Sequence, residues 1–212
     1  MIAPFRKAAA ATVIGAAVVL AGCSLLSTPD PVQLYRFGSL PEAATNASTM
    51  AEPVAVALRR VEFPEASKGD RILGVTGAEA AYIAGARWVS PAEILFNDAV
   101  ESAFASRPDQ VRLLGRREPG VSTRVLSLDV TTFEARYAAP GVAPDAVITV
   151  RARMTILPER SVVNERTFTV VQPSGQNRVS AIVTAFDIAT RDLNSQIVDW
   201  TATATGPAAP AR

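Results

Sequence analysis

Few side chains in this 212-residue chain can carry chemistry on their own. The sequence contains no histidine and a single cysteine, Cys23. This composition excludes Ser-His-Asp and Cys-His catalysis, histidine-ligated zinc and thiolate metal clusters. Any enzymatic chemistry would rest on carboxylates, hydroxyls, arginine and Lys68, the one lysine after residue 22.

Two groups of charged residues are candidates for acid–base work, and both are better explained as structural. Glu93 and Asp98 lie five residues apart, so on one helix they point to different faces and cannot act as a pair. Asp187, Arg191 and Asp192 form an i to i+4 ion pair and a neighbour, as on a solvated helix face. We therefore predict that the protein is not an enzyme and holds neither a metal ion nor a non-covalent cofactor.

The first 22 residues have the pattern of a secretory signal peptide. Arg6 and Lys7 precede Ala8–Ala21, an uncharged run of small and apolar residues, as in the n-region and h-region of such signals. The run is about 14 residues long, short of the roughly 20 that a transmembrane helix needs. We therefore predict that residues 1–22 are removed.

Cys23 is the residue whose neighbours predict specific chemistry. Leu20-Ala21-Gly22-Cys23 resembles the lipobox of bacterial lipoproteins, in which small residues admit the signal peptidase and the thiol receives diacylglycerol. The resemblance implies a mature chain that begins at Cys23 and carries S-diacylglycerol and an N-acyl group as its membrane anchor. Ser24, in place of the aspartate that resembles an inner-membrane retention signal, favours sorting to the outer membrane. The alternative is an ordinary signal peptide cut nearby, with Cys23 a bystander.

The mature composition predicts one domain. Removing residues 1–22 takes away two basic residues and no acidic one, which leaves 19 basic against 20 acidic residues and gives no electrostatic case for nucleic acid. Residues 23–31 are turn-rich and predict a short tether. Nearly half of the chain is hydrophobic, enough for a single core, which we place in 32–200. The tail, 201–212, is predicted to be disordered.

Two amphipathic helices are predicted. Ser90-Pro91-Ala92-Glu93 indicates a helix start, with Ser90 as the capping hydroxyl, Pro91 at the first position and Glu93 as the capping partner. Apolar residues then recur at three-and-four spacing to about Ser106: Leu95, Phe96, Ala99, Val100, Ala103 and Phe104. The same spacing predicts a second helix over 177–200.

The rest of the pattern indicates strands. Short ones are predicted over 32–37, 54–63, 72–75, 80–83 and 111–114, with Tyr82 as a core aromatic, and longer ones over 123–137, 146–157 and 162–171. Alternation and bounding prolines or glycines favour antiparallel pairing with one wet face. Arg151, Arg153 and Arg166 are expected on that face, as ordinary solvated surface or as a basic patch facing a partner. The predicted fold is α+β (mixed α/β), a mostly antiparallel sheet with both helices on one face.

Several segments, taken in order, resemble the ABC-type transport auxiliary lipoproteins, the PqiC-like family. They are the lipobox, Leu34-Tyr35-Arg36-Phe37-Gly38, Ala81-Tyr82, Arg87-Trp88-Val89-Ser90-Pro91, the helix to Phe104 and the last helix. The resemblance implies a periplasmic domain on the outer membrane. It also implies partners: an inner-membrane ABC permease and ATPase, and an MCE-domain protein that bridges the periplasm to move lipids or other hydrophobic molecules.

In this family the lipoprotein is thought to dock the outer-membrane end of the bridge, often as a homo-oligomeric ring. The competing hypothesis is a stand-alone lipid-binding or outer-membrane assembly lipoprotein with a cavity under its sheet. The residues alone leave the cargo, the number of subunits and the docking surface open.

Overall fold

The computed structural model describes residues 32–38, 54–59, 61–114 and 122–205. The predicted signal peptide, Cys23 and the tether therefore lie outside the described residues. All the elements below belong to one compact unit, Gln33–Arg212. In chain order they are β1 (Gln33–Tyr35), β2 (Val54–Leu58), β3 (Arg71–Thr76), β4 (Glu79–Trp88), α2 (Ala92–Ala105), β5 (Val111–Leu114), β6 (Arg124–Tyr137), β7 (Asp145–Ile156), β8 (Ser161–Pro173) and α3 (Val179–Thr205).

Strand β6 is the centre of the sheet. One of its edges pairs along its length with β7, which pairs in turn with β8. Its other edge is shared: Ala57 and Leu58 of β2 pair near its start, Glu62 bridges to Asp129, and Gly74–Thr76 of β3 pair at its end. The chain from β2 to β3 thus runs alongside β6 in the same direction. Outside it, β5 pairs with β2, and β4 and then β1 follow β3.

The predicted mostly antiparallel sheet is wrong. Among the described residues, four strand pairs are parallel, β1–β4, β2–β5, β2–β6 and β3–β6, and three are antiparallel, β3–β4, β6–β7 and β7–β8. Parallel neighbours need a crossover rather than a tight turn. Here β3, β4 and α2 form the crossover between β2 and β5, so the short strands join a mixed sheet.

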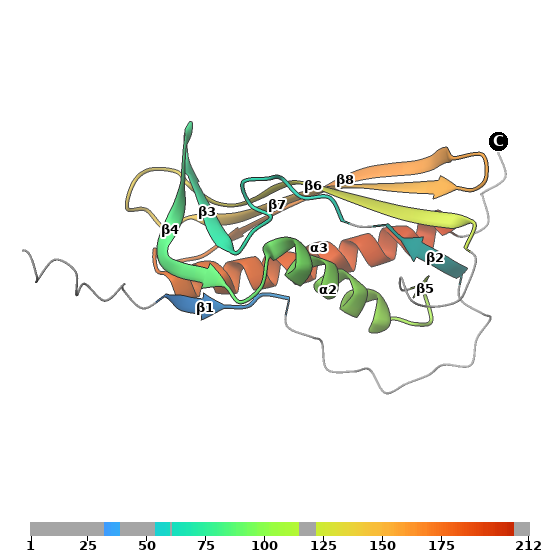
Figure 1. The fold of residues 1–212 in the computed structure, drawn as a ribbon, viewed down its shortest axis with the longest axis horizontal. Helices are drawn as coiled ribbons and strands as arrows, with labels where there is room; N and C mark the ends of the chain where they lie inside the picture. The colour runs from blue at the N-terminus through green and yellow to red at the C-terminus, as the bar shows by residue number, and fades with distance from the viewer. Residues whose placement is uncertain (1–31, 39–53, 60, 115–121, 206–212) are drawn as a thin grey trace, which may run out of the picture. The chain divides into compact units, whose positions relative to one another are not determined.

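Both helices lie on the same side of β6, β7 and β8 (Figure 1). Helix α3 packs against β7 and β8, while α2 packs against α3 and β5. The stripe predicted for α2 is buried except for Ala103, which is partly buried. Helix α3 continues to Thr205, past the predicted end at Trp200, so residues 201–205 are helical and not part of a disordered tail.

The predicted cap of α2 is wrong in detail. Its N-cap is Pro91, one residue after the expected Ser90, and no side-chain hydrogen bond caps the helix. The loop between β2 and β3 satisfies the first N–H groups instead, through two backbone bonds. These join Ala92 to the Gly69 carbonyl at 2.9 Å and Glu93 to the Lys68 carbonyl at 3.2 Å.

Aromatic rings fill the space between sheet and helices. Phe133 of β6 is 3% exposed, and the rings around it come from five parts of the chain. Their centroids lie 4.8 to 6.4 Å from that of Phe133, in the range of favourable aromatic pairs: Phe37, Phe63, Trp88, Phe96 and Phe186. This cluster ties β4, β6, both helices and the segments that hold Phe37 and Phe63 into one core.

Tyr82 is not the core aromatic that its strand pattern predicted. Its side chain is 38% exposed, because β4 leaves the helices behind as the β3–β4 hairpin rises away from them (Figure 1). The hydroxyl donates to the Ala66 carbonyl at 3.0 Å, and the Arg71 guanidinium lies 4.0 Å from the ring centroid. Tyr82 therefore contacts Ala66 and Arg71, and the core aromatic of β4 is Trp88, which is 2% exposed.

Candidate functional site

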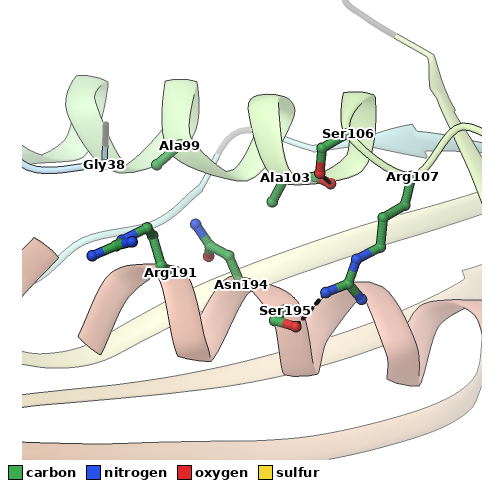
Figure 2. Close-up of a pocket in the computed structure, with 8 residues that line it drawn as sticks. All are labelled: Gly38, Ala99, Ala103, Ser106, Arg107, Arg191, Asn194 and Ser195. Atoms are coloured by element: carbon green, nitrogen blue, oxygen red, sulfur yellow. Dashed lines mark hydrogen bonds between the residues drawn. The ribbon is translucent and has the colours of Figure 1, made fainter. Parts of the chain in front are cut away.

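A cavity of about 150 Å³ lies between the facing sides of α2 and α3, which we call the α2–α3 cavity (Figure 2). Its walls come from three parts of the chain: the end of the β1 segment, α2 with the residues that follow it, and the middle of α3. They are Gly38, Ala99, Ala103, Ser106, Arg107, Arg191, Asn194 and Ser195.

The cavity exists because α2 presents small side chains where α3 presents polar ones. Ala99 and Ala103 put only methyl groups on the α2 wall, one helical turn apart. Asn194 points from α3 towards this wall (Figure 2). A larger apolar residue at either alanine would have filled the space, as at Leu95 and Phe104 elsewhere on the same helix, which are buried.

Asn194 carries a polar atom without a partner. The residue is 3% exposed, and its Oδ1 accepts no hydrogen bond from the described residues. An unsatisfied buried polar group costs about 1–3 kcal/mol, and such groups are rare in folded proteins. Thr190, one turn earlier on α3, is also buried with an unpaired hydroxyl, but it does not line the cavity. Asn194 is therefore a buried polar side chain of the α3 wall whose carbonyl oxygen has no donor among the described residues.

The charged residues that line the cavity are both arginines. Arg107 donates to the Oγ of Ser195 and forms an ion pair with Asp199. Arg191 forms an ion pair with Asp187 at 3.1 Å. The two guanidiniums lie towards opposite ends of the cavity (Figure 2). Guanidinium groups bind carboxylates through several N–H donors at once, and each arginine of the lining already has a carboxylate partner.

Gly38, three residues after the end of β1, contacts both helices. Its φ is +70°, a region that residues with a side chain rarely adopt. Its N–H donates to Oδ1 of Asp187 at 2.9 Å, and a Cβ built on it would lie 2.6 Å from the Cβ of Ala99. Only glycine allows α2 and α3 to approach the chain this closely at the rim of the cavity.

Replacing Gly38 by alanine should destabilise the protein more than the same change at Gly77, which has a φ of +58° and open space where a Cβ would lie. Both variants carry the backbone strain, but only Gly38→Ala forces a methyl group into Ala99, which costs about 1–3 kcal/mol more. Urea unfolding of the mature protein measures the difference. Adding Ala99→Gly should recover part of the loss, and equal losses at the two glycines would contradict the packing explanation.

Glu93 and Asp98, which their spacing predicts not to act as a pair, both lie on α2. Glu93 lies in the first turn of α2, and Asp98 is exposed further along the same helix. The predicted i to i+4 pair of Asp187 and Arg191 is confirmed. Asp192 is exposed beside it.

The three arginines do not form one patch. Arg151 is exposed and donates to Asp129 at 2.6 Å, a hydrogen bond that raises the pKa of the guanidinium above its usual value. Arg153 pairs in register with Glu165. Arg166 pairs with the buried Ala152, and directly opposed residues share a face of the sheet. Arg166 therefore lies on the helix side, 4.9 Å from the Phe168 ring, and its predicted place on the wet face is wrong.

Leu20, Ala21, Gly22, Cys23 and Ser24, the predicted lipidation and sorting residues, lie outside the described residues. In the part of the chain that the structure describes, no helix is long and apolar enough to cross a membrane. The same residues contain no group of three or more acidic side chains arranged to hold a metal ion.

Sequence reasoning missed the residues that make the cavity. Arg107 comes directly after the predicted end of the first helix and Gly38 directly after the first predicted strand, and neither was singled out as a site residue. Asn194 left a trace in the sequence, because Thr190, Asn194 and Thr201 interrupt the apolar stripe of α3 and are all buried. A polar residue on a buried stripe indicates either a buried hydrogen bond or a binding site, and the sequence pattern alone does not distinguish the two.

The chain folds into an α+β domain with a mixed sheet and a pair of helices on one side of it. The α2–α3 cavity lies between these helices. A crystal structure of the protein XCC0632 from Xanthomonas campestris resembles it with a TM-score of 0.70 and 25% identity, over 82% of this chain and 96% of that one. The hypothetical protein CT253 from Chlamydia trachomatis shares the fold at a TM-score of 0.50 and 12% identity, over 73% and 99% of the two chains. The comparison with curated proteins gives no match.

The sequence matches the family described as "ABC-type transport auxiliary lipoprotein component" over residues 35–198. The chain belongs to this family. The family resemblance found in the sequence is thereby confirmed, and with it the association with ABC-type transport and the class of lipoprotein.

Proposed function

We propose that the protein is a non-catalytic docking component of an ABC-type transport system that moves lipids or other hydrophobic molecules between the two membranes. In this proposal, lipid on Cys23 holds it on the periplasmic face of the outer membrane. Its partners are an MCE-domain protein, an ABC permease with its ATPase, and further copies of the same chain. The observation that carries the proposal is the family match, which covers residues 35–198 and begins four residues after the end of the predicted tether at residue 31.

The short tether supports a role at the membrane surface. Gln33, the first residue of β1, lies ten residues after Cys23 in the chain. A chain of this length reaches at most about 35 Å. A lipid on Cys23 would therefore keep the domain within about that distance of the bilayer, where it could receive a partner arriving from the inner membrane.

The competing hypothesis of a stand-alone lipid carrier needs a cavity beneath the sheet. In that place the rings around Phe133 pack against one another, with centroids 4.8 to 6.4 Å from its own. Close packing of aromatic rings leaves no room for an acyl chain. This packing favours the docking role over the lipid carrier.

Photocrosslinking in the native host tests the proposal. A photoreactive amino acid replaces one exposed residue at a time: Tyr82 on the β3–β4 hairpin, Ile94 on α2 and Val171 on β8. We expect at least one position to crosslink to an MCE-domain protein or a permease subunit, and another to a second copy of the chain. Crosslinks only to outer-membrane assembly proteins, or to none of these partners at any position, would overturn it.

The same experiment in a Cys23→Ser background separates anchoring from recognition. If the domain recognises its partner directly, the crosslinks should persist at lower yield, because the released protein is no longer concentrated at the membrane. Crosslinks that are equally strong without the thiol would show that anchoring plays no part in docking.

A further inference from the structure

The outer side of β1 and of the end of β4 combines exposed aliphatic and arginine side chains. Leu34 opposes Arg87 in the parallel register of the two strands, and opposed residues share a face of a sheet. The N–H of Val89 donates to the Tyr35 carbonyl at 2.7 Å, which continues the ladder by one residue and sets Val89 beside Arg36. We call Leu34, Arg36, Arg87 and Val89 the β1–β4 face.

The β1–β4 face points away from the core. Successive side chains alternate between the two sides of a strand, and the neighbours Trp88 and Phe37 are buried on the other side. Leu34 and Val89 are 55% and 45% exposed. They are diagonal neighbours in the register, a spacing at which long side chains can still interact. The face therefore presents an apolar spot flanked by two arginines.

The charges around the face are balanced. Arg87 donates to Asp70 at 2.8 Å, and both side chains are about half exposed. Arg36 lines a surface hollow together with the acidic residues Asp98 and Glu101. The guanidiniums therefore do not call for a bound anion. Their methylene stems extend the apolar surface while their charged ends stay among polar groups, as arginine side chains do at a membrane interface.

The place of the face along the chain indicates its partner. Strand β1 is the first described element, and Leu34 comes eleven residues after Cys23, the residue predicted to carry lipid. An anchored chain would therefore hold this face nearer to the bilayer, along the chain, than any other described strand. Two half-exposed aliphatic residues would bind a membrane only weakly by themselves. On an anchored chain their contact is intramolecular and gains from a high effective concentration.

We propose that the β1–β4 face lies against the lipid bilayer, with Leu34 and Val89 among the lipid head groups, and that this contact orients the domain. The inference rests on the lipid anchor of the proposed function and adds a direction to it. The turn between β7 and β8, which lies far from β1 in Figure 1, would point away from the membrane.

Quenching of a fluorescent dye by lipid tests the contact on the full mature lipoprotein in phosphatidylcholine vesicles. Acylation would block Cys23, so a single introduced cysteine takes a thiol-reactive dye alone. We expect doxyl-labelled phosphatidylcholine to quench the dye at least threefold more strongly at Leu34→Cys or Val89→Cys than at Val162→Cys or Val163→Cys. The last two residues follow the β7–β8 turn and are also about half exposed, so they match the test positions.

A second substitution shows whether the aliphatic spot makes the contact, rather than the tether alone. In the Leu34→Cys protein, Val89→Ser should at least halve the quenching, because it removes the neighbouring aliphatic side chain. The matched change Val163→Ser should leave the quenching unchanged. Adding anionic phosphatidylglycerol should not change it either, since the charges around the face are balanced. Quenching that Val89→Ser does not lower, or that requires the anionic lipid, would overturn the proposal.

The outcomes also separate this inference from the proposed function. If the protein stays on the vesicles but the dye at position 34 is quenched no more than the dye at position 162, the anchor holds and the orientation is overturned. Energy transfer between dyes at position 34 of neighbouring copies, without quenching by lipid, would assign the face to an interface between copies. Protein that does not stay on the vesicles would contradict the lipid anchor itself, and the inference with it.

Discussion

Replacing Phe133 by alanine should lower the free energy of unfolding by about 3–5 kcal/mol, the range for a buried aromatic residue truncated in a core. Phe133 stands where β6, the central strand, meets rings from β4, both helices and the segments that hold Phe37 and Phe63. None of these elements can move into the space left by the missing ring without breaking its own contacts. The void at position 133 should therefore remain largely open. The measurement is urea unfolding of the mature protein, where the midpoint should fall at an unchanged slope.

Phe168 provides the matched control. It is 2% exposed and also lies on a strand facing the helices, but its aromatic neighbour among the described residues is Trp200 alone, at 6.0 Å. It belongs to β8, which among the described strands pairs with β7 alone, so the sheet edge can relax around a truncated side chain. Phe168→Ala should therefore cost less than Phe133→Ala. Equal losses, or a larger loss at Phe168, would show that the ring cluster is not the centre of the fold.

One helix and four strands could be predicted closely from the sequence because their signals are local. Helix α2 and strands β5 to β8 begin and end within two residues of the predicted bounds, since each carries a strong period and is bounded by proline or glycine. Strand β4 was predicted only over 80–83 but runs from Glu79 to Trp88. The first part of this strand belongs to a hairpin that is exposed on both faces and contains several alanines. Apolar and polar residues therefore do not alternate there, and a search for a period of two misses the strand.

Strand pairing could not be predicted in the same way. Alternation along β2 and β3 shows that each has a buried side, but not that both lie beside β6 and parallel to it. Arg166 illustrates the same limit within a hairpin. Its face depends on the register between β7 and β8, which sets it against Ala152, and a shift of one residue would have placed it with Arg151.

The α2–α3 cavity could not be predicted from the sequence for a related reason. Ala99, Ala103 and Asn194 are ordinary residues for two packed helices, and what makes a cavity is that the small side chains oppose the amide. That opposition depends on how far α2 is shifted along α3. The shift is fixed by contacts with residues distant in sequence, such as the approach of Gly38 to Ala99.

Replacing Cys23 by serine should abolish palmitate labelling and release the protein from the membrane. Serine keeps the size and polarity of the position but lacks the thiol that the proposed diacylglycerol transfer requires. Each buried methylene contributes about 0.8 kcal/mol to membrane binding, and two or more acyl chains hold a protein firmly, so losing all of them should change the location completely. The described helices offer no alternative anchor that could span a bilayer.

Two neighbouring variants make this result specific. Ser24→Ala changes the adjacent hydroxyl but keeps the thiol, and should be labelled and retained like the wild type. Ser24→Asp should still be labelled, but should move to inner-membrane fractions on a density gradient if the residue after the cysteine directs sorting. If the Cys23→Ser protein is processed and stays as tightly bound to envelope membranes as the wild type, the anchor lies elsewhere. The docking geometry drawn from the short tether would then have to be abandoned.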